Sequence, residues 1–138
     1  MIESLLPSLK LRGKQLLPIL QGGMGVGISA HRLAGAVAAC GAVGTIASID
    51  LRRLHPDLEK SSVASHDRAT IERANLIALD REIIAAKEIA HGMGMVAVNV
   101  MRAISQYADC VKQACRSRAD AIVMGAGLPL DLPDLTAD

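Results

Sequence analysis

Short apolar segments alternate with longer amphipathic segments along most of this chain. The apolar segments predict β-strands at residues 16–21, 42–47, 95–101 and 120–124. Apolar positions that recur with helical spacing predict helices at residues 29–40, about 68–90 and about 105–117. Ser29 is expected to cap the first helix, and Gly41 is expected to end it.

The longest predicted helix is amphipathic. Its apolar stripe, with spacings of three and four residues, consists of Leu76, Leu79, Ile83, Ala86 and Ala90. Its charged residues are expected to supply the solvated side: Arg73, Arg81, Glu82, Lys87 and Glu88. Before this helix, residues 50–67 are more polar and contain Pro56, so we expect a long loop or insertion there.

The order of elements, βα-βα-βα-β, predicts an α/β fold. Apolar strands that alternate with helices form parallel sheets with right-handed crossovers. Two architectures fit this order: a doubly wound open sheet, and the first four βα units of a (β/α)8 TIM barrel.

Unusual residues follow three of the predicted strands. In a parallel sheet, ligands bind beyond the carboxyl ends of the strands, so residues from different strand ends meet in one place. The residues concerned are Gly22, Gly23, Met24 and Gly25 after the first strand, Asn99 in the third, and Gly125, Ala126 and Gly127 after the fourth. Each glycine turn is also compatible with a simple tight connection, and together they predict a shared site.

Asn99 interrupts an otherwise apolar strand. Alternation places it on one face with Ala97 and Met101, whereas the valines at 96, 98 and 100 take the other face and suit packing against helices. An inward-facing amide costs about 1–3 kcal/mol without partners. Those partners are either neighbouring backbone groups or a planar ligand with donors and acceptors on its edge, such as a flavin ring.

A dinucleotide site is the main alternative. Gly25, Gly27 and Ala30 match the pattern GxGxxA, and Asp50 follows the second strand where a ribose-binding acid is expected. In that fold, however, the first glycine closely follows the strand, and here Gly22 to Met24 intervene. The histidines His31, His55, His66 and His91 are not well placed for acid–base chemistry, so no catalytic residue is assigned.

Composition narrows the function classes. Tyr107 is the only aromatic residue and the net charge is +1, which argues against nucleic-acid partners. The uncharged run at residues 33–49 contains three glycines and predicts a buried helix and strand rather than a membrane span. Three cysteines without metal-ligand spacing indicate buried apolar residues in a reducing cytoplasm, and no metal site is expected.

Four motifs in order resemble the nitronate monooxygenase family. They are PILQGGMGVGIS at residues 18–29, GAVGTI at 41–46, VNVM at 98–101 and DAIVMGAGLP at 120–129. The resemblance covers residues 16–138 and implies an FMN-dependent (β/α)8 barrel that oxidises nitronates with O2 to carbonyl compounds and nitrite. It also implies that Gly22, Gly23 and Met24 lie against the flavin, that Asn99 bonds it, and that Gly125 and Gly127 line the pocket.

Length departs from the family pattern. A full barrel needs about 250 residues, and this chain has 138. The resemblance implies that the catalytic histidine and the phosphate-binding loops come from later strands. We therefore expect the N-terminal half of such a barrel, which would self-associate or pair with a chain that supplies the other half. The alternatives are an NAD-binding α/β domain and a half-barrel without enzymatic activity.

Overall fold

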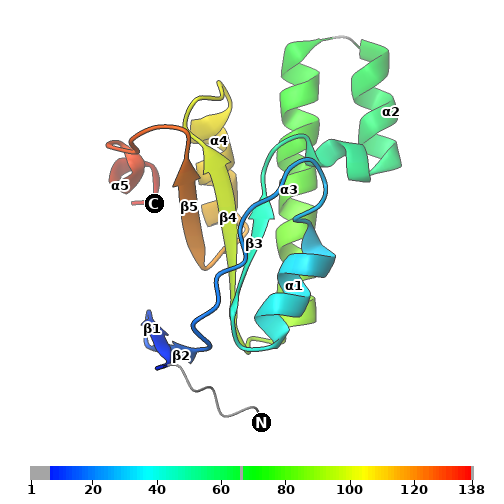
Figure 1. Ribbon diagram of the computed structural model, residues 1–138. Helices are drawn as coiled ribbons and strands as arrows, with labels where there is room; N and C mark the ends of the chain where they lie inside the picture. The colour runs from blue at the N-terminus through cyan, green and yellow to red at the C-terminus, as the bar shows by residue number, and fades with distance from the viewer. Residues whose placement is uncertain (1–6, 66, 138) are drawn as a thin grey trace.

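The apolar segments predicted as strands lie at the centre of the molecule (Figure 1). The computed structural model describes residues 7–65 and 67–137, so His66 lies outside the described residues. In chain order the elements are β1 (Leu9–Leu11), β2 (Lys14–Leu16), α1 (His31–Ala39), β3 (Val43–Ala47), the 3-10 helix η1 (Leu51–Leu54), α2 (Pro56–Ser65), α3 (Arg68–Ala90), β4 (Met95–Met101), α4 (Tyr107–Arg116), β5 (Ala121–Gly125) and α5 (Leu132–Leu135).

The predicted parallel α/β sheet is confirmed. Strand β4 lies between β3 and β5 and is parallel to both. The register places Ala47 beside Asn99 and Asn99 beside Val123, so the carboxyl ends of the three strands reach the same edge. This is the edge at which the sequence predicts a site.

The first predicted strand is only partly formed. Residues 17–21 run parallel to β3 through a single bridge between Leu20 and Val43, with the Gln21 N–H donating to the Val43 carbonyl at 3.0 Å. Pro18 has no N–H to donate, which limits a longer ladder. Leu16 instead belongs to the hairpin of β1 and β2, whose turn at Arg12 and Gly13 has positive φ at both positions.

Strand order follows chain order. Residues 17–21 lie beside β3, β3 beside β4, and β4 beside β5. In a doubly wound sheet the order reverses, for example when the fourth strand returns to the far side of the first. The part of the chain that the structure describes contains no such reversal.

One face of the sheet is packed against helices. Val96, Val98, Val100 and Ile46 are almost completely buried in a core that α1, α3 and α4 complete. The predicted valine face is therefore confirmed, and each such side chain contributes about 1.5–3 kcal/mol by burial. Gly44 allows α1 to approach closely, because a Cβ there would overlap the Ala34 carbonyl.

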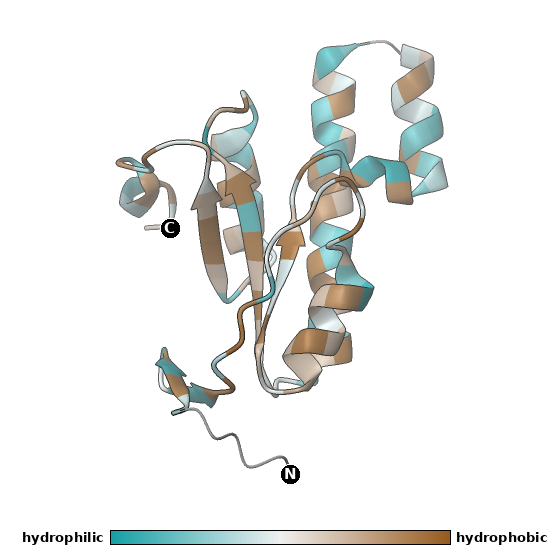
Figure 2. Ribbon diagram, viewed as in Figure 1, coloured by the Kyte–Doolittle hydropathy of each residue, from teal (hydrophilic) through white to brown (hydrophobic). Residues whose placement is uncertain are grey.

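The opposite face is covered by the hairpin at its amino end and only in part at its carboxyl end, where Gly23 lies against Asn99. The β1–β2 hairpin brings Leu16 against Val43, Met95 and Ala97 at the amino end of the strands. Towards the carboxyl end this cover stops, and Val123 is 39% exposed. Figure 2 shows the apolar strands at the centre and the more hydrophilic α2 and upper part of α3 at the periphery.

The predicted loop at residues 50–67 is wrong, because most of it is helical. Pro56 occupies the first position of α2, where its missing N–H costs nothing, and Asp57 and Glu59 lie in the first turn. The predicted helix at 68–90 is confirmed as α3, and the Asp67 carboxylate caps it by accepting from the Thr70 N–H at 2.9 Å.

The uncharged run at residues 33–49 folds as most of α1 and all of β3, as the sequence predicts. Within residues 7–65 and 67–137, no helix is both long enough and apolar enough to cross a membrane.

Candidate functional site

A pocket of about 310 Å³ lies at the carboxyl ends of the strands, on the face that the hairpin leaves uncovered. It is lined by Gly23, Gly25, Val26, Ala47, Ser48, Ile49, Asn99 and Met101. These residues come from the glycine loop, from β4 and from the end of β3 with the turn that follows it. The predicted convergence of the glycine loop and Asn99 at one place therefore agrees with the geometry of the structure.

The glycine loop is held by Ser29 and Gln21. The Ser29 hydroxyl accepts from the Met24 N–H at 2.8 Å and donates to the Gly22 carbonyl at 3.1 Å. The Gln21 amide donates to the Ser29 hydroxyl at 2.8 Å and accepts from the Thr45 N–H at 2.9 Å. The prediction that Ser29 caps α1 is therefore wrong. Ala30 is the N-cap residue of this helix, and its side chain makes no capping hydrogen bond. The Ser29 hydroxyl instead ties the loop together.

Gly23 lies directly against Asn99. A Cβ added to Gly23 would be 2.5 Å from the Asn99 Cβ and 3.1 Å from its Oδ1. A Cβ at Gly25 would be 2.6 Å from the Ile49 side chain. Glycine at both positions lets the loop backbone approach the pocket wall more closely than any other residue would.

The Asn99 amide is only weakly engaged. Among the described residues its side chain makes one hydrogen bond, from Nδ2 to the Val123 carbonyl at 3.3 Å, which is longer than the usual 2.9–3.0 Å. The Asn99 Oδ1 and the second Nδ2 hydrogen have no hydrogen-bond partner among the described residues, and Asn99 lines the adjacent pocket. Its backbone carbonyl accepts from the Ser48 N–H at 3.1 Å and links β4 to the turn after β3.

The remaining predicted site residues lie at the margin of the pocket or outside it. Gly125 borders Asn99, since a Cβ there would be 4.0 Å from the Asn99 Nδ2. Gly22, Met24, Ala126 and Gly127 are absent from the described lining. Ala126 has φ of 56°, a left-handed conformation that is strained for a residue with a Cβ, and Gly127 packs against Arg102.

Three side chains, those of Arg102, Tyr107 and Asp131, form a cluster next to this turn. The Arg102 guanidinium lies 4.2 Å from the centre of the Tyr107 ring, and the Tyr107 hydroxyl bonds Asp131. Burial, followed by the bond to Asp131, raises the pKa of Tyr107. The same bond lowers the pKa of Asp131. The cluster anchors residues 125–131 to the start of α4.

A buried carboxylate lies on α3 at a position where the sequence predicts a solvated side chain. Glu82, expected on the solvated side of α3, is 1% exposed. Its Oε2 lies 2.6 Å from the His31 backbone N and 2.7 Å from the His31 Nδ1, and its Oε1 lies 3.1 Å from the His55 Nε2. Within the described part of the chain, no group of three metal-ligating side chains is placed to hold an ion. We therefore treat these three residues as a hydrogen-bonding and ionic cluster.

This carboxylate occupies the amino end of α1, the place where a dinucleotide fold holds its pyrophosphate. A second anion at the His31 N–H would face like-charge repulsion. Asp50, the predicted ribose-binding acid, lies 3.3 Å from both Arg52 and Arg53. The geometry thus gives no support to a pyrophosphate site at Gly25 and Gly27.

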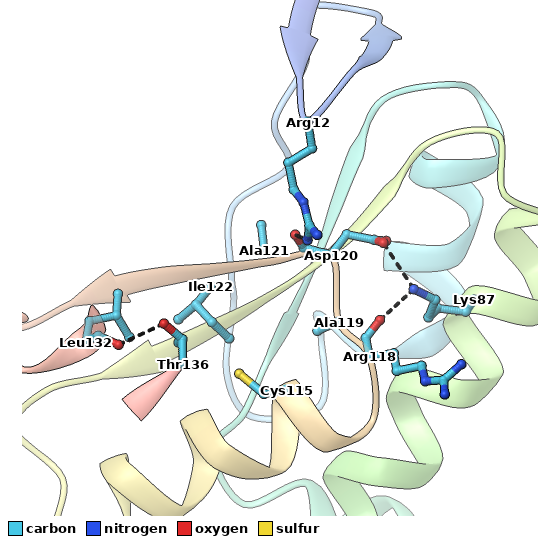
Figure 3. Close-up of a pocket in the computed structure, with 10 residues that line it drawn as sticks. All are labelled: Arg12, Lys87, Cys115, Arg118, Ala119, Asp120, Ala121, Ile122, Leu132 and Thr136. Carbon is cyan, nitrogen blue, oxygen red and sulfur yellow. Dashed lines mark hydrogen bonds and ion pairs between the residues drawn. The ribbon is translucent and has the colours of Figure 1, made fainter. Parts of the chain in front are cut away.

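A larger cavity, of about 590 Å³, lies at the amino end of β5 (Figure 3). Lys87 donates there to the Asp120 carboxylate at 3.1 Å and to the Arg118 carbonyl at 2.6 Å, and the Arg12 guanidinium donates to the Asp120 carbonyl. Lys87 and Arg12 are therefore both bonded to Asp120 there, and the cavity lies at the opposite end of the sheet from the strand ends that form ligand sites in parallel α/β folds. We therefore place the candidate site at Asn99, although the pocket there is smaller.

Comparison of the chain with models of known protein families and with curated proteins gives no match.

Proposed function

We propose that the pocket at Asn99 binds the ring of a flavin, and that the chain forms part of an FMN-dependent (β/α)8 oxidoreductase that acts on nitronates. The observation that carries this proposal is the contact between the Gly23 backbone and the Asn99 amide at the carboxyl ends of the strands. A flat ring with donors and acceptors on its edge suits a glycine-lined wall beside a free amide.

The arrangement of the sheet supports the barrel. Strands that stay in chain order, with α1, α3 and α4 packed on one core face, fit one wall of a closed barrel. The opposite face would then line the interior, with the hairpin closing the amino end of the strands.

The residues present fit the flavin ring but not its phosphate. Every residue that lines the described pocket is uncharged. A bound flavin would accept electrons from the nitronate and pass them to O2, while Asn99 would orient the ring and the glycine loop would cover one side of it. A phosphate group would gain little from these residues, so FMN and riboflavin should bind with similar affinity.

We also propose that the open face is completed by a second copy of the chain or by another chain, because β5 and residues 17–21 both border the described sheet with one unpaired side. Light scattering should report a species larger than a monomer. A stable monomer that binds flavin tightly would contradict this proposal. The three free cysteines favour a reducing compartment, the cytoplasm.

Equilibrium titration with riboflavin, FMN and NADH tests the proposed function. We expect quenching of flavin fluorescence on binding, affinities for riboflavin and FMN within about threefold of each other, and no response to NADH. Binding of NADH without binding of flavin would favour the dinucleotide alternative. Binding of neither would favour a half-barrel without a cofactor.

A further inference from the structure

We infer that Glu82 is a positioning residue for the glycine loop of the pocket. It touches no pocket-lining residue in any hydrogen bond or ion pair of the described chain, and it acts through two neighbours. One is His31 at the start of α1, and the other is His55 at the junction of η1 and α2.

The first arm runs through α1. The Glu82 Oε2 accepts the His31 backbone N–H at 2.6 Å, and this fixes the first residue of the helix. Ser29, two residues earlier, holds both Gly22 and Met24 through its hydroxyl. The position of Ser29, and with it the height of the loop over the sheet, therefore depends on where α1 begins.

The second arm runs through η1. The His55 Nε2 lies 3.1 Å from the Glu82 Oε1, a close polar contact that lacks hydrogen-bond geometry, and the His55 carbonyl accepts the Leu58 and Glu59 N–H groups that begin α2. Leu54 precedes His55, and its side chain packs against Gly27 at the other end of the glycine loop. A Cβ added to Gly27 would be 2.8 Å from the Leu54 Cδ2. One carboxylate thus fixes the supports of both ends of the loop.

The burial of the Glu82 carboxylate indicates that its contacts with His31 and His55 are specific. A carboxylate that is 1% exposed is costly unless hydrogen bonds and opposite charges compensate for its desolvation. Within the described chain, the polar contacts of this carboxylate come from His31 of α1 and from His55 between η1 and α2. Asn75, the other buried polar residue of α3, bonds the Ser48 carbonyl at 2.9 Å and so contacts the pocket from a different side.

Residue-resolved amide hydrogen exchange on the full chain tests the inference. The Met24 and Ser29 N–H groups have internal acceptors and should exchange slowly in the wild type. In Glu82→Gln they should exchange roughly tenfold faster or more, the factor expected when a hydrogen bond to a charged group is lost. The Val98 N–H in the sheet reports any loss of global stability and should be accelerated by a clearly smaller factor than the loop amides. Glu88→Gln, an exposed carboxylate on the same helix, is the matched control and should change neither.

A purely structural role gives a different pattern. If Glu82 only stabilises the fold, Met24, Ser29 and Val98 will all exchange faster by the same factor, and the inference is overturned. Unchanged exchange at Met24 and Ser29 also overturns it. If Glu82→Gln fails to fold, His55→Ala removes one arm only and should speed exchange at the loop, again by a larger factor than at Val98.

The inference does not require a flavin, so the two proposals fail separately. Faster loop exchange in Glu82→Gln, in a protein that never binds riboflavin, would keep the inference and remove the proposed function. Riboflavin binding with unchanged loop exchange would do the reverse.

Discussion

The two faces of the sheet differ in how they are covered. On one face, Ile46 and the alternating valines of β4 are fully enclosed by three helices. On the other, a short hairpin covers the amino end, and the carboxyl end carries a polar amide, a glycine loop and a pocket. The first face carries the buried core, and the second carries the pocket at which we propose that a ligand binds.

The largest expected effect is on the enclosed face. Ile46→Ala should lower the free energy of unfolding by about 2–5 kcal/mol, because Ile46 is fully buried and its truncation leaves a cavity. Val123→Ala on the open face should change it by no more than about 0.5 kcal/mol. Urea denaturation of both variants measures the difference. Equal losses would show that the two faces are packed alike.

Gly23 lies where the loop meets the open face. Gly23→Val should abolish riboflavin binding and cost about 1–3 kcal/mol of stability, because its side chain must displace Asn99. Gly22→Val introduces a Cβ with no atom within 4 Å and should be far milder in both respects. Far-UV circular dichroism and flavin fluorescence provide the measurements. Full riboflavin binding by Gly23→Val would place the ring elsewhere.

The variant Asn99→Ala tests whether the amide side chain on the same face binds the ring. Asn99→Ala should weaken riboflavin binding by about 1–3 kcal/mol, the cost of removing a hydrogen-bonding partner in a pocket. The protein itself should lose little stability, since the one side-chain bond of Asn99 within the described chain is long. Isothermal titration calorimetry provides the measurement, and an unchanged affinity would remove Asn99 from the site.

The smallest effect concerns Cys110, a buried thiol on the enclosed face. Burial raises its pKa from 9.0 to about 11. Because the folded pKa is the higher one, this contribution to stability is complete below about pH 9 and is lost as pH rises through 11. Unfolding free energies measured between pH 8 and pH 11 should fall in the wild type more than in Cys110→Ala. Identical pH profiles would show that the thiol is not enclosed.

Much of the fold could be predicted from sequence alone. The alternation at residues 95–101 assigned the valines and Asn99 to opposite faces, and the structure confirms this for the valines. The β1–β2 hairpin was missed, although Arg12 and Gly13 mark a two-residue turn. The loop prediction for residues 50–67 failed because Pro56 and the acids after it are a helix start.

The prediction that Glu82 lies on the solvated side of α3 is wrong. It lies three residues after Leu79 and four before Ala86, which places it inside the apolar stripe rather than opposite to it. Its charge suggested solvent, while its position indicated burial. Its partners, His31 and His55, are distant in sequence, and only the packing of α1 and η1 against α3 brings them together.

If a flavin ring binds against Gly23 and Asn99, it should change the surroundings of the backbone amides there. An NMR titration of the 15N-labelled chain with riboflavin measures this change. We expect shifts in the amide signals of Gly23, Gly25, Ser48 and Asn99, with the signals of His31 and Asp120 unchanged. Shifts confined to His31, or to the cavity at Asp120, or no shifts at saturating riboflavin, would contradict binding of the ring at Gly23 and Asn99.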